Sequence, residues 1–198
     1  YSKVIPKVSG EFFYLLNLLS KRKIELNFFT GNHDIWVLDY FTNEFNMKVH
    51  RDGLIRLIHG KNFFIHHGDN IGKRNLIDRA ISYIFRNRIA QFAFRLIHPD
   101  IGLRIASYFA NLSNKYNVDE VFHGETEPHI IFSRKFLERK HIDFFLMGHR
   151  HTPVIYRLSE KSWYINSGDW LTNFTWVEIH ERSVVLNSLK GAISKVAW

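Results

Sequence analysis

The sequence predicts an α/β protein, because short apolar strands alternate with segments of helical periodicity, and polar loops close several of the strands. Apolar residues recur at helical spacing over residues 12–19, and basic residues 21–23 follow, as is favourable at a helix C-terminus. Residues 24–30 predict a strand that ends at Gly31, and helical spacing resumes over residues 35–45. This succession is typical of an α/β layer.

The rest of the chain supplies further strands and one clear helix. A hairpin is expected from residues 54–59 and 62–67, which Gly60 and Lys61 separate. A helix is expected over residues 128–140, because Pro128 is well suited to a first helical turn. Strands are also expected over residues 143–147, 154–158, 163–166, 174–179 and 184–189.

Residues 71–115 differ from the rest of the chain in charge, with eight Lys and Arg against two Asp. Their apolar residues fall at helical intervals, and Pro99 divides them into two expected helices. We expect a basic helical cap over the strand ends, inserted at about residues 71–117. Its charge has three interpretations: a solvated helix face, attraction to a diphosphate or an anionic lipid surface, or contact with nucleic acid.

Composition excludes several classes of protein. With 198 residues, 45% apolar and 23% charged, the chain fits one globular domain with a net charge of +8 rather than a disordered or fibrous protein. It contains no cysteine, so disulfides, thiolate metal sites and a cysteine nucleophile are excluded within it. No charge-free apolar run approaches the roughly 18 residues that cross a bilayer.

Three polar clusters follow expected strands: Asn32-His33-Asp34, His67-Gly68-Asp69 and His149-Arg150-His151. Ligands of an open α/β sheet gather where strands end, so we expect the clusters to converge. Imidazole and amide oxygen ligands without sulfur suit a hydrolytic Mn²⁺, Fe or Zn²⁺ centre, and a two-metal hydrolase is the natural class. The alternative for the histidines at 149 and 151 is a structural role in a hydrogen-bonded turn.

The ordered set Gly31-Asn32-His33-Asp34, His67-Gly68-Asp69 and Gly148-His149-Arg150-His151 resembles the calcineurin-like metallophosphoesterases. Within that superfamily the chain is similar to the bacterial UDP-2,3-diacylglucosamine hydrolases of lipid A biosynthesis. The resemblance covers nearly the whole length, including residues 96–100 of the basic segment and residues 164–170 of the tail. It implies a β-sandwich flanked by helices, with an inserted helical cap.

The resemblance also implies roles for individual residues. Asn32, His67 and His149 would ligate one metal ion, and His151 would reach the other. His33 would be catalytic, stabilising charge on the scissile phosphate or protonating a leaving oxygen, although some relatives have arginine there.

Further implied roles lie outside the metal ligands. Asp69 would fix its own loop or a ligating imidazole. Apart from the resemblance, Ser113, Asn114 and Lys115 lie where the basic segment is expected to return toward the site, so we expect them to contact the substrate. The alternative is that they are ordinary helix-end residues.

The resemblance implies hydrolysis of the pyrophosphate of UDP-2,3-diacylglucosamine to UMP and 2,3-diacylglucosamine 1-phosphate. It also implies two divalent metal ions as cofactors, with Mn²⁺ as the first candidate. The substrate is a lipid-linked nucleotide sugar, so we expect a cytoplasmic protein, peripheral on the inner membrane and attracted to its anionic surface, with no nucleic-acid partner. Two alternatives stay open: another calcineurin-like phosphodiesterase or nuclease, and a non-catalytic interaction module on the same fold.

One departure from the family pattern concerns its first two metal motifs. Asp-x-His and Gly-Asp-x-x-Asp, the second of which supplies the carboxylate that bridges both metals, occur nowhere in these 198 residues. We therefore expect a single domain over residues 1–198 that is partial at its N-terminus, and little hydrolysis by the chain as it stands.

Overall fold

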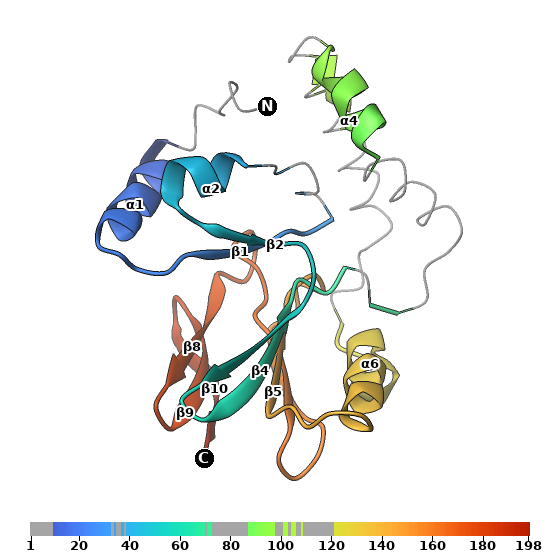
Figure 1. The fold of residues 1–198 in the computed structure, drawn as a ribbon. Coiled ribbons are helices and arrows are strands. Elements are labelled where there is room, and N and C mark those ends of the chain that lie inside the picture. Colours follow the sequence, from blue (N-terminus) through green and yellow to red (C-terminus); the bar gives the residue numbers. More distant parts are fainter. Residues whose placement is uncertain are drawn as a thin grey trace. The chain divides into compact units, whose positions relative to one another are not determined.

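A computed structural model describes residues 10–32, 34, 37, 39–69, 71–72, 87–97, 101–102, 104–105, 108 and 121–198. The chain forms two compact units (Figure 1). Unit 1 comprises Tyr1–Arg51 and Asn75–Val118, and unit 2 comprises Asp52–Arg74 and Asp119–Trp198. The single domain with a cap at about 71–117 stays a prediction, because most of that segment lies outside the described residues.

The first part of unit 1 packs around a small aromatic core. It contains α1 (Gly10–Lys21), β1 (Asn27–Phe29), α2 (Tyr40–Phe45) and β2 (Lys48–His50), with β1 and β2 paired in parallel. Phe13 stacks on Phe45 at 5.6 Å between ring centroids, and both pack with Leu16 and Met47. The helix expected from residue 12 is confirmed, whereas the described helix α2 starts at Tyr40, later than the expected residue 35.

In the basic segment the structure gives the bounds of helix α4 (Arg88–Arg95), and residues 101–102, 104–105 and 108 are also helical. Asn87 caps its N-terminus, because its side-chain oxygen accepts hydrogen bonds from the backbone N–H groups of Ile89 and Ala90 at 2.8 and 3.2 Å.

Unit 2 is built on two sheets. The five-stranded sheet has the order β3-β4-β5-β7-β6, with β3 (Leu54–Ile58), β4 (Lys61–His66), β5 (Phe144–Met147), β6 (Val154–Arg157) and β7 (Trp163–Asn166). Strands β4, β5 and β7 run parallel, so their carboxyl ends lie at one edge. The second sheet is antiparallel and contains β8 (Thr175–His180), β9 (Ser183–Ser188) and β10 (Gly191–Ala197).

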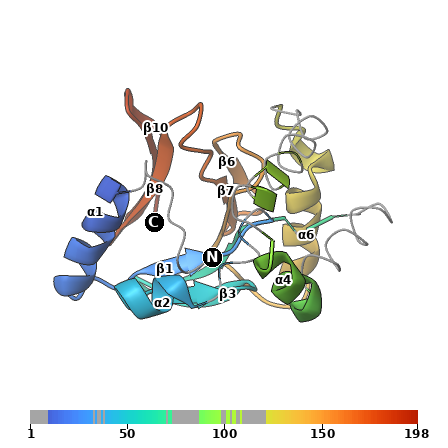
Figure 2. The same cartoon turned by 90° about the horizontal axis from the view of Figure 1, so that it is seen from above.

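Alternating side chains of the five-stranded sheet build two core layers. Phe63 stacks on Phe144 at 4.8 Å and packs with Val184 of the three-stranded sheet. The next residues, Phe64 and Phe145, face the other way and pack with α6 (Pro128–Leu137). Figure 1 shows α6 and the three-stranded sheet on opposite sides of β4 and β5, and Figure 2 shows them on opposite sides of β6 and β7. The expected α/β class and the helix-flanked β-sandwich are confirmed.

Two strands and one turn were not expected from the sequence. Strand β10 contains Gly, Ala and Ser among its apolar residues, and a bulge lies between Ala192 and Ser194. Its strand conformation therefore depends on pairing with β9 rather than on local propensity. Strand β2 has only three residues and depends on its pairing with β1. A short 3₁₀ turn, η2 (Gly124–Thr126), lies directly before α6. In the part of the chain that the structure describes, no helix has the length and apolarity to cross a bilayer.

Candidate functional site

Two of the predicted histidines meet at the carboxyl edge of the five-stranded sheet. His67 follows β4, and His149 follows β5 after Gly148; the two strands pair in parallel with His66 opposite Met147. The Gly148 N–H donates a hydrogen bond of 3.0 Å to the His67 carbonyl, which joins the two loops. The His67 and His149 rings lie edge to face, with centroids 5.5 Å apart. The structure therefore brings these two imidazoles together.

The loop that carries His149 has an unusual backbone. His149 and His151 have φ angles of 68° and 55°, a region that residues with a Cβ adopt only at a cost. The Gly148 carbonyl accepts hydrogen bonds from Arg150 N at 2.8 Å and from Asn166 Nδ2 at 2.9 Å. At the other end of the loop, Asn173 Nδ2 donates to the His151 carbonyl at 2.8 Å. These bonds hold the strained conformation.

The charge state of His149 suits metal ligation. Burial, followed by the neighbouring His67, lowers the pKa of His149 to about 3. The imidazole is therefore neutral at physiological pH and keeps a lone pair for a cation. Two adjacent imidazoles, one of them buried and neutral, fit a divalent ion that accepts nitrogen ligands. Among the described residues, no group of three His, Asp or Glu side chains is arranged to hold a metal ion.

The other predicted site residues fall into three groups. Asp69 is buried beside His67, and His151 is exposed at the end of its loop. Asn32 follows β1 in unit 1, and its ligation of a metal stays a prediction. His33, Ser113, Asn114 and Lys115 lie outside the described residues, so their roles also stay predictions.

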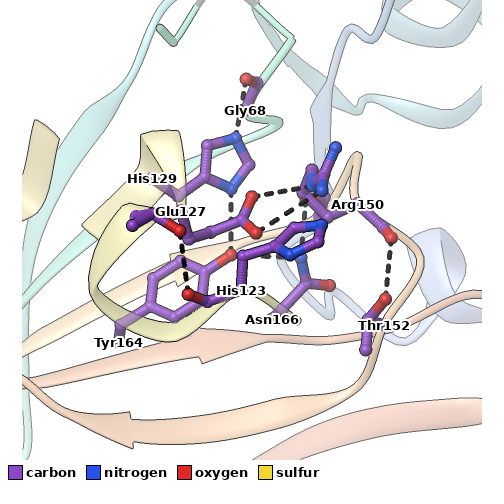
Figure 3. A network of polar contacts seen from close by, with 10 residues as sticks. Gly68, His123, Glu127, His129, Arg150, Thr152, Tyr164 and Asn166 are labelled. Carbon is purple, nitrogen blue, oxygen red and sulfur yellow. Dashed lines mark hydrogen bonds and ion pairs between the residues drawn. The ribbon is translucent and has the colours of Figure 1, made fainter. Parts of the chain in front are cut away.

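The sequence did not single out Glu127 and His129, which border the histidine pair from the start of α6. Neither residue belongs to the three polar clusters that follow the expected strands. Both are almost fully buried, and Figure 3 shows their side chains directed at Arg150 and Gly68. The only local signal was an acidic residue directly before the helix-opening Pro128, which is unremarkable in a loop.

An α/β sandwich with histidines at adjacent strand ends is the arrangement expected of a metallophosphoesterase, and sequence comparison supports that class. No protein-family model matches the chain. The chain is 29% identical over 206 residues to a UDP-2,3-diacylglucosamine hydrolase of Porphyromonas gingivalis, an alignment that covers 96% of this chain and 78% of the relative. This similarity confirms the resemblance drawn from the motifs.

Similar solved structures are remote. An archaeal phosphodiesterase has 11% identity and a TM-score of 0.40, with 93% of this chain and 76% of that chain covered. Vps29 of Entamoeba histolytica, in complex with Zn²⁺, has 12% identity and a TM-score of 0.40, with 98% and 90% covered. Likenesses this weak carry no argument about chemistry.

Proposed function

We propose that this chain is a metal-dependent phosphoesterase that hydrolyses the pyrophosphate of UDP-2,3-diacylglucosamine to UMP and 2,3-diacylglucosamine 1-phosphate. The observation that carries the proposal is 29% identity, over 96% of the chain, to an enzyme named for that substrate. The His67 and His149 pair at the sheet edge adds support, because metal-dependent hydrolases use neutral imidazoles as ligands.

Each residue has a distinct task in this proposal. Divalent ions, with Mn²⁺ the first candidate, would polarise the phosphate oxygens and lower the pKa of an attacking water. His67 and His149 would hold one ion together with Asn32, and His151 would hold the second. As the water oxygen bonds to one phosphorus and the anhydride bond breaks, His33 would stabilise the charge or protonate the leaving oxygen. Asp69 would keep the His67 loop in place.

We also propose that the protein acts at the cytoplasmic surface of the inner membrane, where a diacylated nucleotide sugar resides. Helix α4 supports this, because Ile89, Phe92 and Leu96 are exposed and their spacing places them on one helical face. The flanking basic residues of the 71–115 segment would attract anionic head groups and the diphosphate of the substrate.

The proposal is tested by incubating the purified chain with Mn²⁺ and UDP-2,3-diacylglucosamine and measuring UMP by chromatography. We expect only slow UMP release, because the two absent motifs would supply further metal ligands, and loss of this residual rate in His149→Ala. The matched control is His180→Ala, an exposed histidine on β8, which should keep the wild-type rate. Cleavage of bis(p-nitrophenyl) phosphate without any UMP release would reject the substrate.

A second candidate is a nuclease or nucleotide phosphodiesterase, which the basic residues interleaved with aromatics in the 71–115 segment favour. Salt-sensitive binding to single-stranded oligonucleotides, tighter than binding to anionic vesicles, would favour this candidate. The absent Asp-x-His and Gly-Asp-x-x-Asp motifs favour a non-catalytic module instead. Failure to bind Mn²⁺ or to cleave any phosphodiester would favour that module.

A further inference from the structure

The first turn of α6 contacts both loops that carry the strand-end histidines. His129 Nε2 lies 3.0 Å from the Gly68 carbonyl oxygen, in the loop that follows β4. Glu127 reaches the loop that follows β5, where its carboxylate pairs with Arg150. Figure 3 shows these two contacts side by side. A single short segment of chain therefore anchors both loops.

The hydrogen bonds of His129 have a defined direction. The Gly68 carbonyl can only accept, so Nε2 of His129 carries a proton. Nδ1 of the neutral ring then accepts from the Tyr164 hydroxyl at 2.9 Å. The Tyr164 oxygen accepts in turn from Asn166 Nδ2 at 3.2 Å, and the same amide donates to the Gly148 carbonyl at 2.9 Å. One continuous network thus joins Gly68 to Gly148 through buried side chains, and Figure 3 shows it from Gly68 to Asn166.

Glu127 anchors Arg150 by charge. The Glu127 side chain is only 2% exposed, and its Oε1 lies 2.7 Å from Nε of Arg150, whose side chain is 26% exposed. Oε2 accepts a longer hydrogen bond of 3.4 Å from Nη2. Oε1 accepts no hydrogen bond from any described residue, so its compensation is the ion pair. Because a buried carboxylate is costly without a cation, this pair fixes the residue between His149 and His151.

The His129 ring also fills the space between the two loops. A Cβ built on Gly68 would lie 2.7 Å from His129 Cε1 and 3.3 Å from the Cβ of His149. The His129 and His149 rings are 6.3 Å apart at their centroids. His129 therefore packs against the backbone of one loop and the side chain of the other.

We propose that Glu127 and His129 are positioning residues that hold the His67 and His149 imidazoles in the arrangement that a divalent cation needs. Neither residue belongs to a strand-end motif. The cation in this inference rests on the proposed function, whereas the anchoring contacts lie within the protein itself.

The first test measures amide hydrogen exchange in EDTA-treated protein. Glu127→Gln keeps the side-chain size and removes the charge, and exchange over residues 148–151 should become roughly tenfold faster. His129→Phe keeps a ring and removes both hydrogen bonds, and the same change is expected over residues 67–69. Exchange in β5 should not change. The matched controls are Glu125→Gln, which changes an exposed carboxylate in η2, and His180→Phe. Both should exchange like the wild type over residues 67–69 and 148–151.

The second test separates positioning from stability. Calorimetric titration with Mn²⁺ should give a Kd about 10–100-fold higher in Glu127→Gln and His129→Phe than in the wild type. A residue with only a structural role would lower Tm and leave the Kd of the folded protein unchanged. If Glu127→Gln does not fold, Glu127→Gln/Arg150→Gln removes both charges of the pair, and its Kd should also be raised.

Two outcomes would contradict different claims. The positioning roles would be overturned if the folded Glu127 and His129 variants kept wild-type exchange rates and bound Mn²⁺ with a Kd within about twofold of the wild type. If the wild-type chain itself binds no Mn²⁺, the proposed function fails. The exchange rates of the EDTA-treated variants then decide whether Glu127 and His129 hold the loops.

Discussion

His149 and His151 show at the residue scale how strain and hydrogen bonding combine in one loop. Each left-handed residue with a Cβ costs about 1–3 kcal/mol. The bonds from Asn166 to Gly148 and from Asn173 to His151 offset part of that cost and fix both ends of the loop. The conformation that presents the imidazoles is therefore maintained by side chains from other parts of unit 2.

Gly68 permits the close approach of His129, and this gives the first prediction. Gly68 has φ +108° and its missing Cβ would meet His129 at 2.7 Å, so Gly68→Ala should lower the free energy of unfolding by about 2–4 kcal/mol. Gly124→Ala is the control, because Gly124 also has a positive φ, +59°, but has no atom within 4 Å. Gly124→Ala should lower the free energy of unfolding by only about 1 kcal/mol. Equal losses in urea denaturation would contradict the steric argument.

Glu125 provides a prediction about pH. Hydrogen bonds from Arg134, and then from the Tyr156 hydroxyl at 2.7 Å, lower the pKa of Glu125 below its ordinary value of 4.5. A carboxyl whose folded pKa is depressed stabilises the fold above its unfolded pKa, and this stabilisation is lost as pH falls through the folded pKa. The urea midpoint of Glu125→Gln should therefore lie below that of the wild type at pH 6, and the difference should shrink at pH 3. A difference that is equal at both pH values would contradict this assignment.

Helix α6 illustrates at the element scale how one segment serves both core and site. Its first turn carries His129 toward the loops, while Ile130 packs against the five-stranded sheet. The backbone can satisfy both tasks because successive helical residues point about 100° apart, so neighbours face different surroundings.

Adjacent isoleucines of α6 test this division. Ile130 is 0% exposed and Ile131 is 56% exposed, so the same substitution should have different consequences. Ile130→Ala should lower the free energy of unfolding by about 2–5 kcal/mol, because it leaves a cavity against Phe145 and its neighbours. Ile131→Ala should cost under about 1 kcal/mol. Chemical denaturation of both variants measures the difference, and similar losses would mean that α6 does not pack as described.

On the scale of the whole molecule, two compact units each have a core, and the metal-ligand candidates that the structure brings together belong to unit 2. A ligand that binds only the folded state stabilises it by mass action. Binding of the proposed cation should therefore raise the thermal stability of the protein.

Mn²⁺ at a concentration 100 times its Kd should raise the free energy of unfolding by about 2.7 kcal/mol. This corresponds to an increase in Tm of roughly 5–10 °C. EDTA should reverse the shift. His149→Ala should lose it, whereas His180→Ala should keep it, as differential scanning calorimetry can measure. An undiminished shift in His149→Ala would show that the ion binds elsewhere.

Elements that depend on neighbouring residues could be predicted directly from the amino-acid sequence. Gly60 and Lys61 marked the β3–β4 hairpin, Pro128 marked the start of α6, and polar residues marked the ends of β4 and β5. Turn and capping preferences act over a few residues, and so they can be read directly from the chain. The motif order also indicated the similarity that comparison confirmed.

The side chains that support those motifs could be identified only in the folded protein, because they lie far from the motifs along the chain. Glu127 pairs with Arg150, 23 residues away, and His129 meets Gly68, 61 residues away. Strand β10 likewise exists through its pairing with β9 rather than through its own propensity. Glu127 and His129 hold the two loops because both side chains are buried, and a charged or polar group removed from water needs a hydrogen-bond or ion-pair partner within the protein.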